Sequence, residues 1–355
     1  MATIVHITSG DLWGGAEAQL LLQLEELKVQ NLEVILFNKL ETYMRYSEAG
    51  INCQVFEESH GFINLFSEIK KFLPTDSMIF AHGYKELALA VLLKFSLNLK
   101  IVAVFHGLRE PQRNFIANLK SQLYFTIYKL LAKLFANKVI CVSDALKNSL
   151  GFNNSIVIRN CVKLPALPVA NTKKKLGTPI IFMAGRLVTI KRYDLAIKAI
   201  KEVLKKTGVE LQIAGDGIER SQLEQLCKEL KIENHVKFLG FRKDIAELLS
   251  QSSVFLICSD SEGIPTILLE AMASGAKCIA TRVGGIPEVV NSIGIGCCQL
   301  VSAGSVKEIS DAICAAFTEE NSIDIVQIRK SIETDFSPKR AVGELMKIVD
   351  ELAVN

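Results

Sequence analysis

The sequence has few of the features that mark membrane, secreted or disordered proteins. It contains only eight prolines and no uninterrupted run of about 18 apolar residues that could span a bilayer. Its first residues, MATIVHITSG, lack a basic start followed by a long apolar stretch, so we expect no signal peptide. The nine cysteines stand in apolar runs without a CxxC pair, which favours reduced core residues and a cytoplasmic location.

The charges are also few and balanced. The formal net charge is +3 and no compact basic block occurs, so we expect no nucleic-acid partner. No two histidines or cysteines stand at ligand spacing, and the stretch Ser259–Glu262 (SDSE) imitates a DxD-type metal site only loosely. We therefore predict no metal and no other cofactor.

What is present is the pattern of an α/β protein. A chain of 355 residues exceeds what one hydrophobic core usually supports, which favours two domains. Short apolar strands alternate with helical patterns on both sides of a break between about Lys163 and Pro179, where prolines, a lysine run and a glycine interrupt the periodicity. This alternation predicts two doubly wound halves, each with a parallel sheet covered on both faces.

The expected strands can be named from their apolar runs. In the first half, Thr3–Thr8 precedes the helical pattern Ala16–Val29, and further strands are expected in LEVILFN, SMIFAHG, KIVAVFHG and KVICVSD. In the second half they are expected in PIIFMAGRL, VELQIAGDG, HVKFLGF, SVFLICSD and AKCIATRVGG. Ligands of such sheets bind beyond the carboxyl ends of the strands, so the residues after each strand are the first candidates for a site.

Two of these loops suit a phosphate ligand. Gly14 and Gly15 precede a helix, where glycine lets backbone N–H groups approach a phosphate, although a strand-to-helix turn often needs glycine for its own geometry. Arg186 and Lys191 follow the strand in PIIFMA, and a forked cation beside a point charge suits a diphosphate. A solvated basic turn is the alternative for this second loop.

The stretch SDSEGIPTILLEAMASG places two carboxylates around a helix start. Gly263 permits a tight turn, and Pro265 suits the first turn of a helix that should begin close to Ile264. Free N–H groups there can bind a phosphate oxygen, with Glu262 beside it, and Glu270 in the second turn can accept bonds from ribose hydroxyls. The alternative is that Glu270 is the exposed position of a half-buried helix, but its neighbours are nearly all apolar.

Two histidines follow predicted strands. His106 comes directly after KIVAVF and before Gly107, and His82 occupies a comparable FAHG context with less weight. A polar ring at a strand end is a candidate for a site, although such a histidine is more often a structural residue.

Taken together, the motifs resemble the retaining glycosyltransferases of family four, whose GT-B fold has two Rossmann-like domains facing across a cleft. The resemblance is carried by GGAE, GRLVTIKRYD, IAGDG, FLGF, EGIPTILLEAMASG and ATRVGGIPE, and it is strongest between Ile180 and Glu288. It implies an acceptor-binding domain of residues 1–165 completed by a C-terminal helix, 338–355. Residues 166–337 would then form the donor-binding domain.

The resemblance also assigns roles to single residues. The implied catalytic residues, which surround the donor sugar and its diphosphate, are His106, Arg186, Lys191 and Glu262. The implied donor-binding residues are Gly14, Gly15, Arg186, Lys191, Gly240, Phe241, Glu262, Gly263, Ile264, Pro265, Thr266 and Glu270. Among these, Glu270 would hold the ribose, and Gly240 with Phe241 would pack near the base.

The implied reaction moves a sugar from a nucleotide-diphosphate sugar, with UDP favoured over GDP or ADP, to an acceptor hydroxyl with retention of configuration. The two cations and the helix N-terminus would stabilise the leaving phosphate without a metal, in a front-side mechanism. A double displacement by paired carboxylates competes with it, but Glu270 is engaged on the ribose and the sequence shows no partner for Glu262. The implied acceptors belong to bacterial glycan, lipopolysaccharide or glycolipid synthesis.

The segment 118–138 (NLKSQLYFTIYKLLAKLFANK) carries lysines and aromatics without acidic residues. Such a basic amphipathic helix can lie on an anionic membrane, which suits a lipid-linked acceptor at the inner face of the cell membrane. A buried helix with a solvated lysine edge is an equal alternative.

Other functions stay open at this point. A sugar phosphorylase or a nucleotide-sugar epimerase could use the same fold, and a silent nucleotide-sugar binding module could keep the same residues. A nicotinamide-dependent oxidoreductase has less support, because GxGxxG is missing after the first strand and the acidic residue expected about 20 residues later is ambiguous at Glu33.

Overall fold

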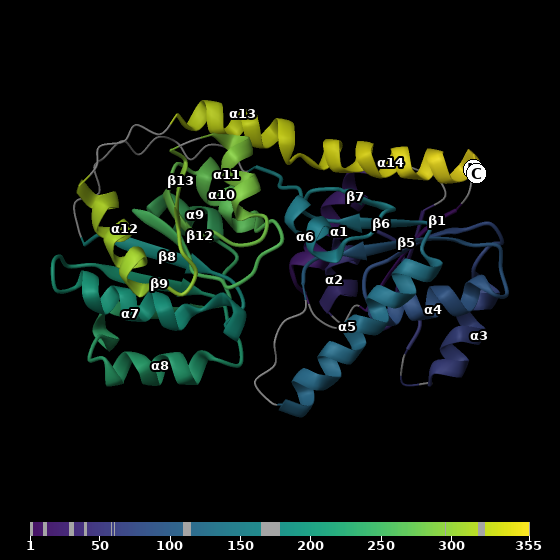
Figure 1. Ribbon diagram of the computed structural model, residues 1–355, viewed down its shortest axis with the longest axis horizontal. Coiled ribbons are helices and arrows are strands. Elements are labelled where there is room, and N and C mark those ends of the chain that lie inside the picture. The colour runs from purple at the N-terminus through teal and green to yellow at the C-terminus, as the bar shows by residue number, and fades with distance from the viewer. Residues whose placement is uncertain are drawn as a thin grey trace. The chain divides into compact units, whose positions relative to one another are not determined.

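The protein divides into two compact units, shown in Figure 1. The computed structural model describes residues 3–354 except 10–12, 28–31, 39–40, 58, 60, 109–114, 165–177, 295 and 319–323. One unit comprises Met1–Cys161 together with Phe336–Asn355, and the other comprises Val162–Asp335. The boundary expected after residue 165, and most of the expected linker, lie outside the described residues. Each unit is an α/β domain, as the sequence predicts.

The N-terminal unit contains a seven-stranded, all-parallel sheet in the order β3-β2-β1-β4-β5-β6-β7. The strands are β1 Ile4–Thr8, β2 Leu32–Leu36, β3 Cys53–Val55, β4 Met78–Ala81, β5 Lys100–Phe105, β6 Lys138–Cys141 and β7 Ser155–Val157. Their nearly continuous apolar sequences follow from burial of both faces of the sheet. The edge strands β3 and β7 were not predicted, because three residues each are too short to form a pattern.

Helices cover both faces of this sheet. They are α1 Gly15–Glu26, α2 Glu41–Glu48, α3 Phe62–Phe72, α4 Tyr84–Lys94, α5 Phe115–Phe135, α6 Asp144–Leu150 and α14 Pro338–Val354. Alternate residues of β1 separate the two layers: Val5 packs in the core with α3 to α6, whereas Ile4 packs with α14. The amphipathic α14 buries Leu345 and Ile348 in that second core, so the C-terminus completes the N-terminal unit.

The C-terminal unit contains a six-stranded parallel sheet in the order β10-β9-β8-β11-β12-β13. The strands are β8 Ile180–Ala184, β9 Glu210–Ala214, β10 Val236–Gly240, β11 Val254–Ile257, β12 Lys277–Thr281 and β13 Cys298–Val301. The first five coincide with the predicted runs. The edge strand β13 was not predicted, because the polar and exposed Gln299 interrupts its short apolar run.

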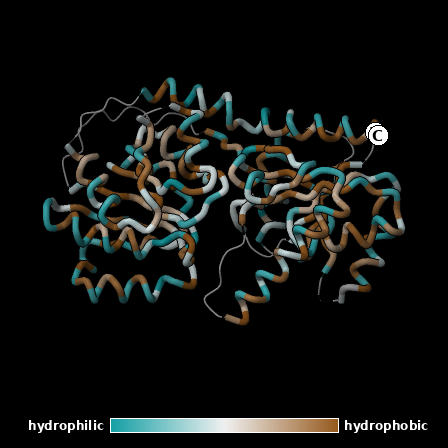
Figure 2. Tube along the Cα trace, viewed as in Figure 1, coloured by the Kyte–Doolittle hydropathy of each residue, from teal (hydrophilic) through white to brown (hydrophobic). Residues whose placement is uncertain are grey.

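The helices of this unit are α7 Tyr193–Val203, α8 Arg220–Glu229, α9 Ile245–Gln251, α10 Thr266–Ala273, α11 Ile286–Ile293, α12 Val306–Thr318 and α13 Ile325–Asp335. Short 3-10 helices occupy Thr189–Lys191 and Glu233–His235. In Figure 2 the helices alternate hydrophilic and hydrophobic residues, whereas the strands inside each unit are mainly hydrophobic. This is the pattern that buries one stripe of each helix against a sheet.

Candidate functional site

The loop after β8 and the loop after β11 are joined by an ion pair. Nζ of Lys191, at the end of the 3-10 helix, lies 2.7 Å from Oε1 of Glu262, whose side chain is only 10% exposed. The hydroxyl of Ser259 donates to the same oxygen at 2.6 Å. The sequence could not indicate this ion pair, because 71 positions of chain separate Glu262 from Lys191. The carboxylate is therefore fixed in place before any ligand binds.

The next cation along the chain is also neutralised. Arg192 has a left-handed backbone, φ 52°, and its guanidinium bonds both Asp194 at 3.0 Å and Asp260 at 3.1 Å. These two carboxylates raise the pKa of Arg192 above its usual range. Arg186 follows β8 directly and is exposed. The structure thus places Arg186, Lys191 and Glu262 at the carboxyl edge of one sheet and gives Arg192 a structural role that the sequence did not indicate.

Glycines of the AGDG motif bring the loops after β8 and β9 into backbone contact. A Cβ on Gly215 would lie 2.0 Å from the carbonyl oxygen of Gly185, and one on Gly217 would lie 2.4 Å from that of Leu187. The N–H of Leu187 donates to Asp216 at 2.8 Å across the same contact. Only glycine fits here, so this motif fixes the loop that carries Arg186.

The glycines of ATRVGG, after β12, bring their own loop into backbone contact with the loop that carries Glu262. A Cβ on Gly284 would lie 1.8 Å from the carbonyl oxygen of Glu262, and one on Gly285 would lie 2.2 Å from that of Gly263. The N–H of Gly285 also donates to Gly263 at 2.9 Å. The candidate list from the sequence omitted Gly284 and Gly285; the signal that could have found them is a double glycine directly after a strand.

The helix α10 begins slightly later than expected. Pro265 is its N-cap, with an extended backbone, so the helix starts at Thr266 rather than close to Ile264. The reason is that a residue before proline avoids the helical region, which keeps Ile264 out of the helix. Pro265 has no polar side-chain atom with which to cap this N-terminus. Its first N–H groups and the positive end of the helix dipole lie directly after Gly263 and Glu262.

Glu270 lies in the second turn of α10 between buried neighbours. Burial raises the pKa of its carboxyl to about 7. Among the residues that the structure describes, none forms a hydrogen bond or ion pair with its carboxylate, whereas its backbone carbonyl accepts a bond from the N–H of Ser274. A half-buried carboxylate without a partner is destabilising in the free protein, and a ligand with hydroxyl donors would relieve that penalty.

Gly14 and Gly15 form the start of α1 in the N-terminal unit. The N–H of Gly14, the N-cap, donates to Oε2 of Glu17 at 3.1 Å. Gly15 is exposed, and no described heavy atom lies within 4 Å of the position that a Cβ would take. The packing of the described residues therefore gives a reason for Gly14, through the nearby Glu17 carboxylate at 3.2 Å, but none for Gly15.

The predicted base-side residues lie at the end of β10. Gly240 has a left-handed backbone, φ 67°, and its carbonyl accepts a bond from the N–H of Gly215 at 2.7 Å. Phe241 follows with a side chain that is 64% exposed. An exposed aromatic ring next to a strand end can stack on a flat ligand.

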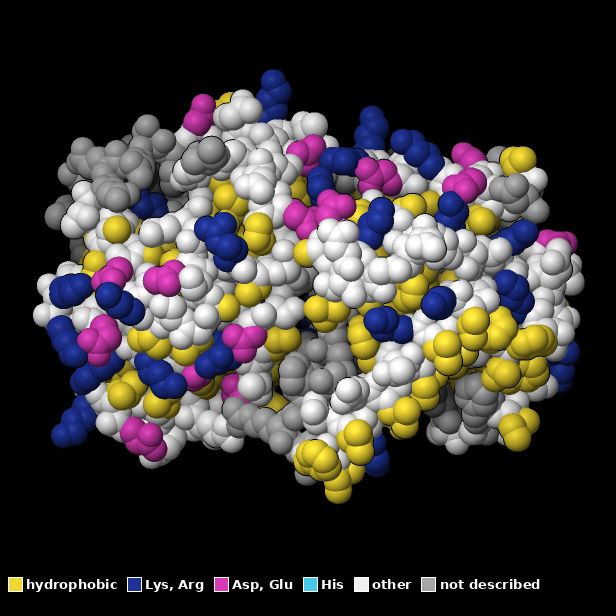
Figure 3. Space-filling model, viewed as in Figure 1, with side chains coloured by type: hydrophobic (Ala, Val, Ile, Leu, Met, Phe, Trp, Pro, Cys, Tyr) yellow, Lys and Arg dark blue, Asp and Glu magenta, His cyan; other side chains and the backbone are white. Residues whose placement is uncertain are grey.

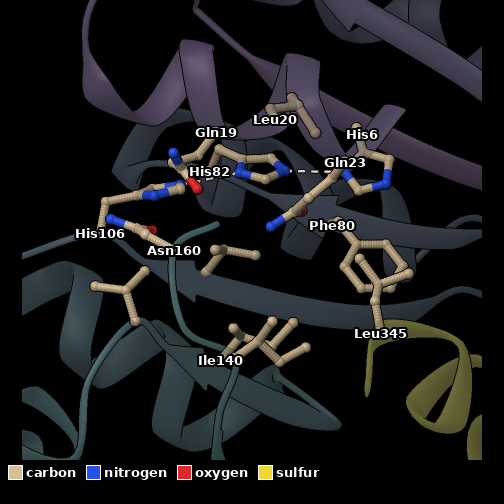
Figure 4. Close-up of a pocket in the computed structure, with 13 residues that line it drawn as sticks. His6, Gln19, Leu20, Gln23, Phe80, His82, His106, Ile140, Asn160 and Leu345 are labelled. Carbon is tan, nitrogen blue, oxygen red and sulfur yellow. Dashed lines mark hydrogen bonds between the residues drawn. The ribbon is translucent and has the colours of Figure 1, made fainter. Parts of the chain in front are cut away.

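His106 is part of a chain of three histidines in the N-terminal unit, shown in Figure 4. Nδ1 of His6 lies 3.0 Å from Nε2 of His82, and Nδ1 of His82 lies 3.0 Å from Nε2 of His106. The sheet creates this arrangement: β1, β4 and β5 are neighbours, His6 pairs with Phe80, and Phe80 pairs with Val102. Each histidine is thus shifted two residues along the next strand and stays on the same face.

Burial lowers the pKa of all three rings. The pKa of His6 falls to about 3 and that of His106 to about 4, and the pKa of His82 falls well below its usual value through burial and then through its two histidine neighbours. All three are therefore neutral at physiological pH. The sequence underrated His82 and omitted His6; a lone histidine inside the apolar strand IVHIT was the available signal.

The helix α5 presents an apolar surface. Of its 21 residues, only Tyr128 and Ala132 are buried. Figure 3 shows hydrophobic side chains along this part of the surface with lysines among them. The large exposed apolar residues of α5 are Phe115, Ile116, Leu119, Leu123, Tyr124, Ile127, Leu130 and Leu134. The alternative of a buried helix with a solvated lysine edge is therefore wrong.

Among the described residues, no group of three or more histidine, cysteine, aspartate or glutamate residues is arranged to hold a metal ion. No helix in the described ranges combines the length and apolar character needed to cross a bilayer.

Known proteins resemble this chain, most of all in the C-terminal unit. Residues 169–329 match the model of the glycosyl transferases group 1. The chain is 37% identical over 157 residues to the N-acetyl-alpha-D-glucosaminyl L-malate synthase of Bacillus anthracis, covering 44% of this chain and 41% of that protein. It is 32% identical over 230 residues to an uncharacterised glycosyltransferase of Haemophilus influenzae, covering 63% of this chain and 62% of that one. The alignments thus span only about two fifths and three fifths of these curated relatives.

A solved structure gives the fold. HepE of Anabaena in complex with UDP-glucose superposes with a TM-score of 0.83 at 20% identity, covering 99% of this chain and 100% of that one. At this identity the likeness concerns the fold, and it matches the two parallel sheets described above. Residues 169–329 are thus similar to the glycosyl transferases group 1, and the chain has the GT-B fold.

Proposed function

We propose that the protein is a retaining glycosyltransferase that moves a sugar from a UDP-sugar to an acceptor hydroxyl. The observation that carries this proposal is the cluster at the carboxyl edge of the second sheet. There the Lys191–Glu262 ion pair precedes the N-terminus of α10, and Glu270 stands without a described partner one turn further along. A cation, free helix N–H groups and a carboxylate in this order suit a diphosphate followed by a ribose.

The diphosphate binds to Arg186, Lys191 and the first N–H groups of α10. Arg186 supplies a fork of N–H donors and Lys191 a point charge, and both stand on loops fixed by glycine contacts. In the reaction, negative charge grows on the leaving phosphate, and preorganised cations and N–H groups stabilise it. We expect these groups to replace a divalent metal, so activity should persist in EDTA.

The sugar and the ribose lie on either side of this diphosphate. Glu262, held by Lys191 and Ser259, accepts bonds from hydroxyls of the sugar, and Glu270 accepts bonds from the ribose hydroxyls. Phe241 and Gly240 pack near the base. His106 and the Gly14–Gly15 turn belong to the N-terminal unit and are proposed to contact the sugar and the diphosphate.

Retention follows from a front-side attack. With Glu262 engaged by Lys191 and Ser259, it is a poor nucleophile for a double displacement, because two hydrogen bonds already stabilise its charge. The acceptor hydroxyl instead approaches on the side of the leaving phosphate, which takes its proton. The donor sugar is a hexose or hexosamine, which agrees with the name of the Bacillus anthracis relative.

The acceptor is a glycan or a lipid-linked precursor of bacterial polysaccharide or glycolipid. Support comes from α5, where Lys120 and Lys133 accompany the exposed apolar stripe. Such a surface can insert apolar side chains between lipids while lysines meet anionic headgroups. We therefore propose a cytoplasmic protein that binds the inner face of the membrane peripherally.

A panel of UDP-, GDP- and ADP-sugars tests the proposal. Ligands that bind only the folded state raise the melting temperature, so UDP-hexoses or UDP-N-acetylhexosamines should raise it and the matched GDP- and ADP-sugars should not. The stabilising donor is then incubated with extracted lipid and glycan acceptors, with and without EDTA. Conversion of the donor to an epimer, or to sugar 1-phosphate in the presence of phosphate, would contradict the proposal.

A further inference from the structure

The three-histidine chain has a property that single histidines lack. Each neutral imidazole carries one hydrogen, on Nδ1 or on Nε2. Each of the two bonds in the chain needs one hydrogen between its nitrogens, and the third hydrogen must then stand at one end. The tautomers of the three rings are therefore coupled.

Only two arrangements keep both bonds. If Nδ1 of His6 donates to Nε2 of His82, then Nδ1 of His82 donates to His106, and His106 carries its hydrogen on Nδ1. If the direction is reversed, His106 donates from Nε2, its Nδ1 is a bare acceptor, and Nε2 of His6 carries the terminal hydrogen. The tautomer of His6 thus determines whether Nδ1 of His106 donates a hydrogen bond to a ligand or accepts one from it.

The two ends of the chain are unpartnered. Nε2 of His6 and Nδ1 of His106 are both buried, and neither has a hydrogen-bond partner among the described residues. All three rings line one cavity of about 20 Å³, enough for one water molecule or one hydroxyl group. Its other walls are mostly apolar, with Phe80 and Leu345 near the His6 end in Figure 4, and the amides of Gln19, Gln23 and Asn160 also line it.

The environment favours one direction. Both directions leave one terminal N–H group and one bare nitrogen, and a buried N–H group without an acceptor is the rarer of the two in proteins. The direction therefore depends on which end of the chain places a polar group beside the terminal N–H group. The ring of His6 stacks on that of Phe80, with 4.8 Å between centroids, and Phe80 offers no acceptor to an N–H group at Nε2, whereas the amide of Asn160 lies beside His106 in Figure 4. The terminal hydrogen then stands on Nδ1 of His106, beside Asn160 on the opposite side of the cavity in Figure 4.

We propose that His6 and His82 are positioning residues that hold Nδ1 of His106 as a fixed hydrogen-bond donor for a hydroxyl oxygen of the sugar. The identity of that oxygen as a sugar hydroxyl rests on the proposed function, whereas the coupling of the tautomers does not. A donor fixed in advance needs no reorganisation when the ligand arrives, and a neutral ring adds no charge beside the diphosphate.

Nitrogen-15 NMR of the imidazole rings in the full chain tests the coupling directly. We expect the Nδ1–H tautomer for His6, His82 and His106 in the free protein, with the exposed His235 as an internal reference. The variant His6→Phe removes the donor to His82 and should give His106 a mixture of tautomers. The variant His6→Asn should restore Nδ1–H at His106, because its amide N–H can replace the lost donor.

The matched control is Ile140→Val, which changes the lining of the same cavity but none of the three histidines. It should leave all three tautomers unchanged. If His6→Phe does not fold, His6→Gln serves instead, because it also removes the donor from the Nδ1 position. An Nε2–H tautomer at His106 in the parent protein, or an unchanged His106 in the folded His6 variants, would overturn the proposal.

Kinetics separate this inference from the proposed function. Loss of one oriented hydrogen bond should lower kcat/KM of His6→Phe by about 3- to 10-fold, with recovery in His6→Asn and no change in Ile140→Val. If the tautomers are coupled but the protein transfers no sugar, the proposed function and the sugar hydroxyl as ligand of His106 are contradicted. The coupling through the three-histidine chain would still stand. Normal kcat/KM in His6→Phe with a mixed tautomer at His106 would refute the positioning role.

Discussion

Lys191 and Glu262 form an ion pair of 2.7 Å between two loops at the carboxyl edge of the second sheet. The pair means that the lysine proposed to bind the diphosphate is already engaged by a carboxylate. A bound diphosphate must compete with Glu262 for Lys191 or share it. The two residues therefore affect nucleotide binding in opposite directions.

We first predict opposite effects on UDP binding from the two halves of this pair. Glu262→Gln should leave Lys191 to the diphosphate and keep or increase the affinity for UDP, while sugar transfer falls by about 10²- to 10³-fold, the usual effect of losing an oriented polar group in a site. Lys191→Met should weaken the affinity for UDP by at least about tenfold. Titration calorimetry and a transfer assay measure both. Lys198→Met, which breaks an exposed pair with Asp194, is the control.

The second prediction concerns Arg186 and Lys191 together. Arg186→Ala and Lys191→Ala should each lower turnover of the donor by about 10²- to 10³-fold. The reason is that each variant loses a cation that would stabilise the negative charge developing on the leaving phosphate. Unaltered far-UV circular dichroism would show that the fold is kept. Full activity in both variants would refute their assignment to the diphosphate.

The third prediction follows from the raised pKa of Glu270, about 7. Between about pH 4.5 and 7 the unfolded chain has released this proton while the folded protein keeps it, so the free energy of unfolding falls as pH rises. Glu270→Gln should remove this fall and stabilise the free protein by about 1–3 kcal/mol at pH 8, with no effect at pH 4.5. Urea unfolding at the two pH values measures it, with the exposed Glu233→Gln as control.

The same pKa gives a test of the ribose contact. A carboxylate accepts hydroxyl bonds best when ionised, so UDP binding should strengthen as pH rises to about 7 and should release protons near pH 6.5. Calorimetry in buffers of different ionisation enthalpy detects that release. If Glu270→Gln folds normally and binds UDP with the same affinity as the parent protein, Glu270 has a structural role and does not contact the ribose.

The fourth prediction uses the glycine that the described packing does not require. Gly15→Ala should leave the melting temperature unchanged or slightly higher, because no described atom lies within 4 Å of the new Cβ and alanine favours helices. Donor turnover should nevertheless fall if a diphosphate approaches this backbone. Gly284→Ala is the contrasting variant, and its clash at 1.8 Å with the carbonyl of Glu262 should destabilise the fold itself.

The fifth prediction concerns the apolar stripe of α5. The double variant Leu119→Glu and Leu123→Glu should abolish flotation with vesicles that contain anionic lipid, because it removes inserted side chains and adds repulsive charge. Parent protein should float with anionic vesicles and less with neutral ones. Val326→Glu, at a position that is 73% exposed in the C-terminal unit, is the matched control and should float like the parent.

The sequence predicted well those features that depend on neighbouring residues. Long apolar runs gave every central strand of both sheets, and the glycine and proline near Glu262 located a helix start to within two residues. Three edge strands were not predicted: β3 and β7 have only three residues each, and β13 is interrupted by the exposed Gln299. The roles of Glu262, Lys191 and Glu270 remain predictions, although their positions at one sheet edge and on α10 are now described.

What the sequence determined by itself was the α/β class, the two halves and the strand-end loops that carry the candidate residues, because strand periodicity and glycine turns are local properties. Tertiary structure alone decided the partners. Lys191 meets Glu262 across 71 residues of chain, and His6 meets His82 across 76. The strand orders β8-β11 and β1-β4 bring these residues together, and strand order is set by the packing of whole sheets rather than by any short stretch of sequence.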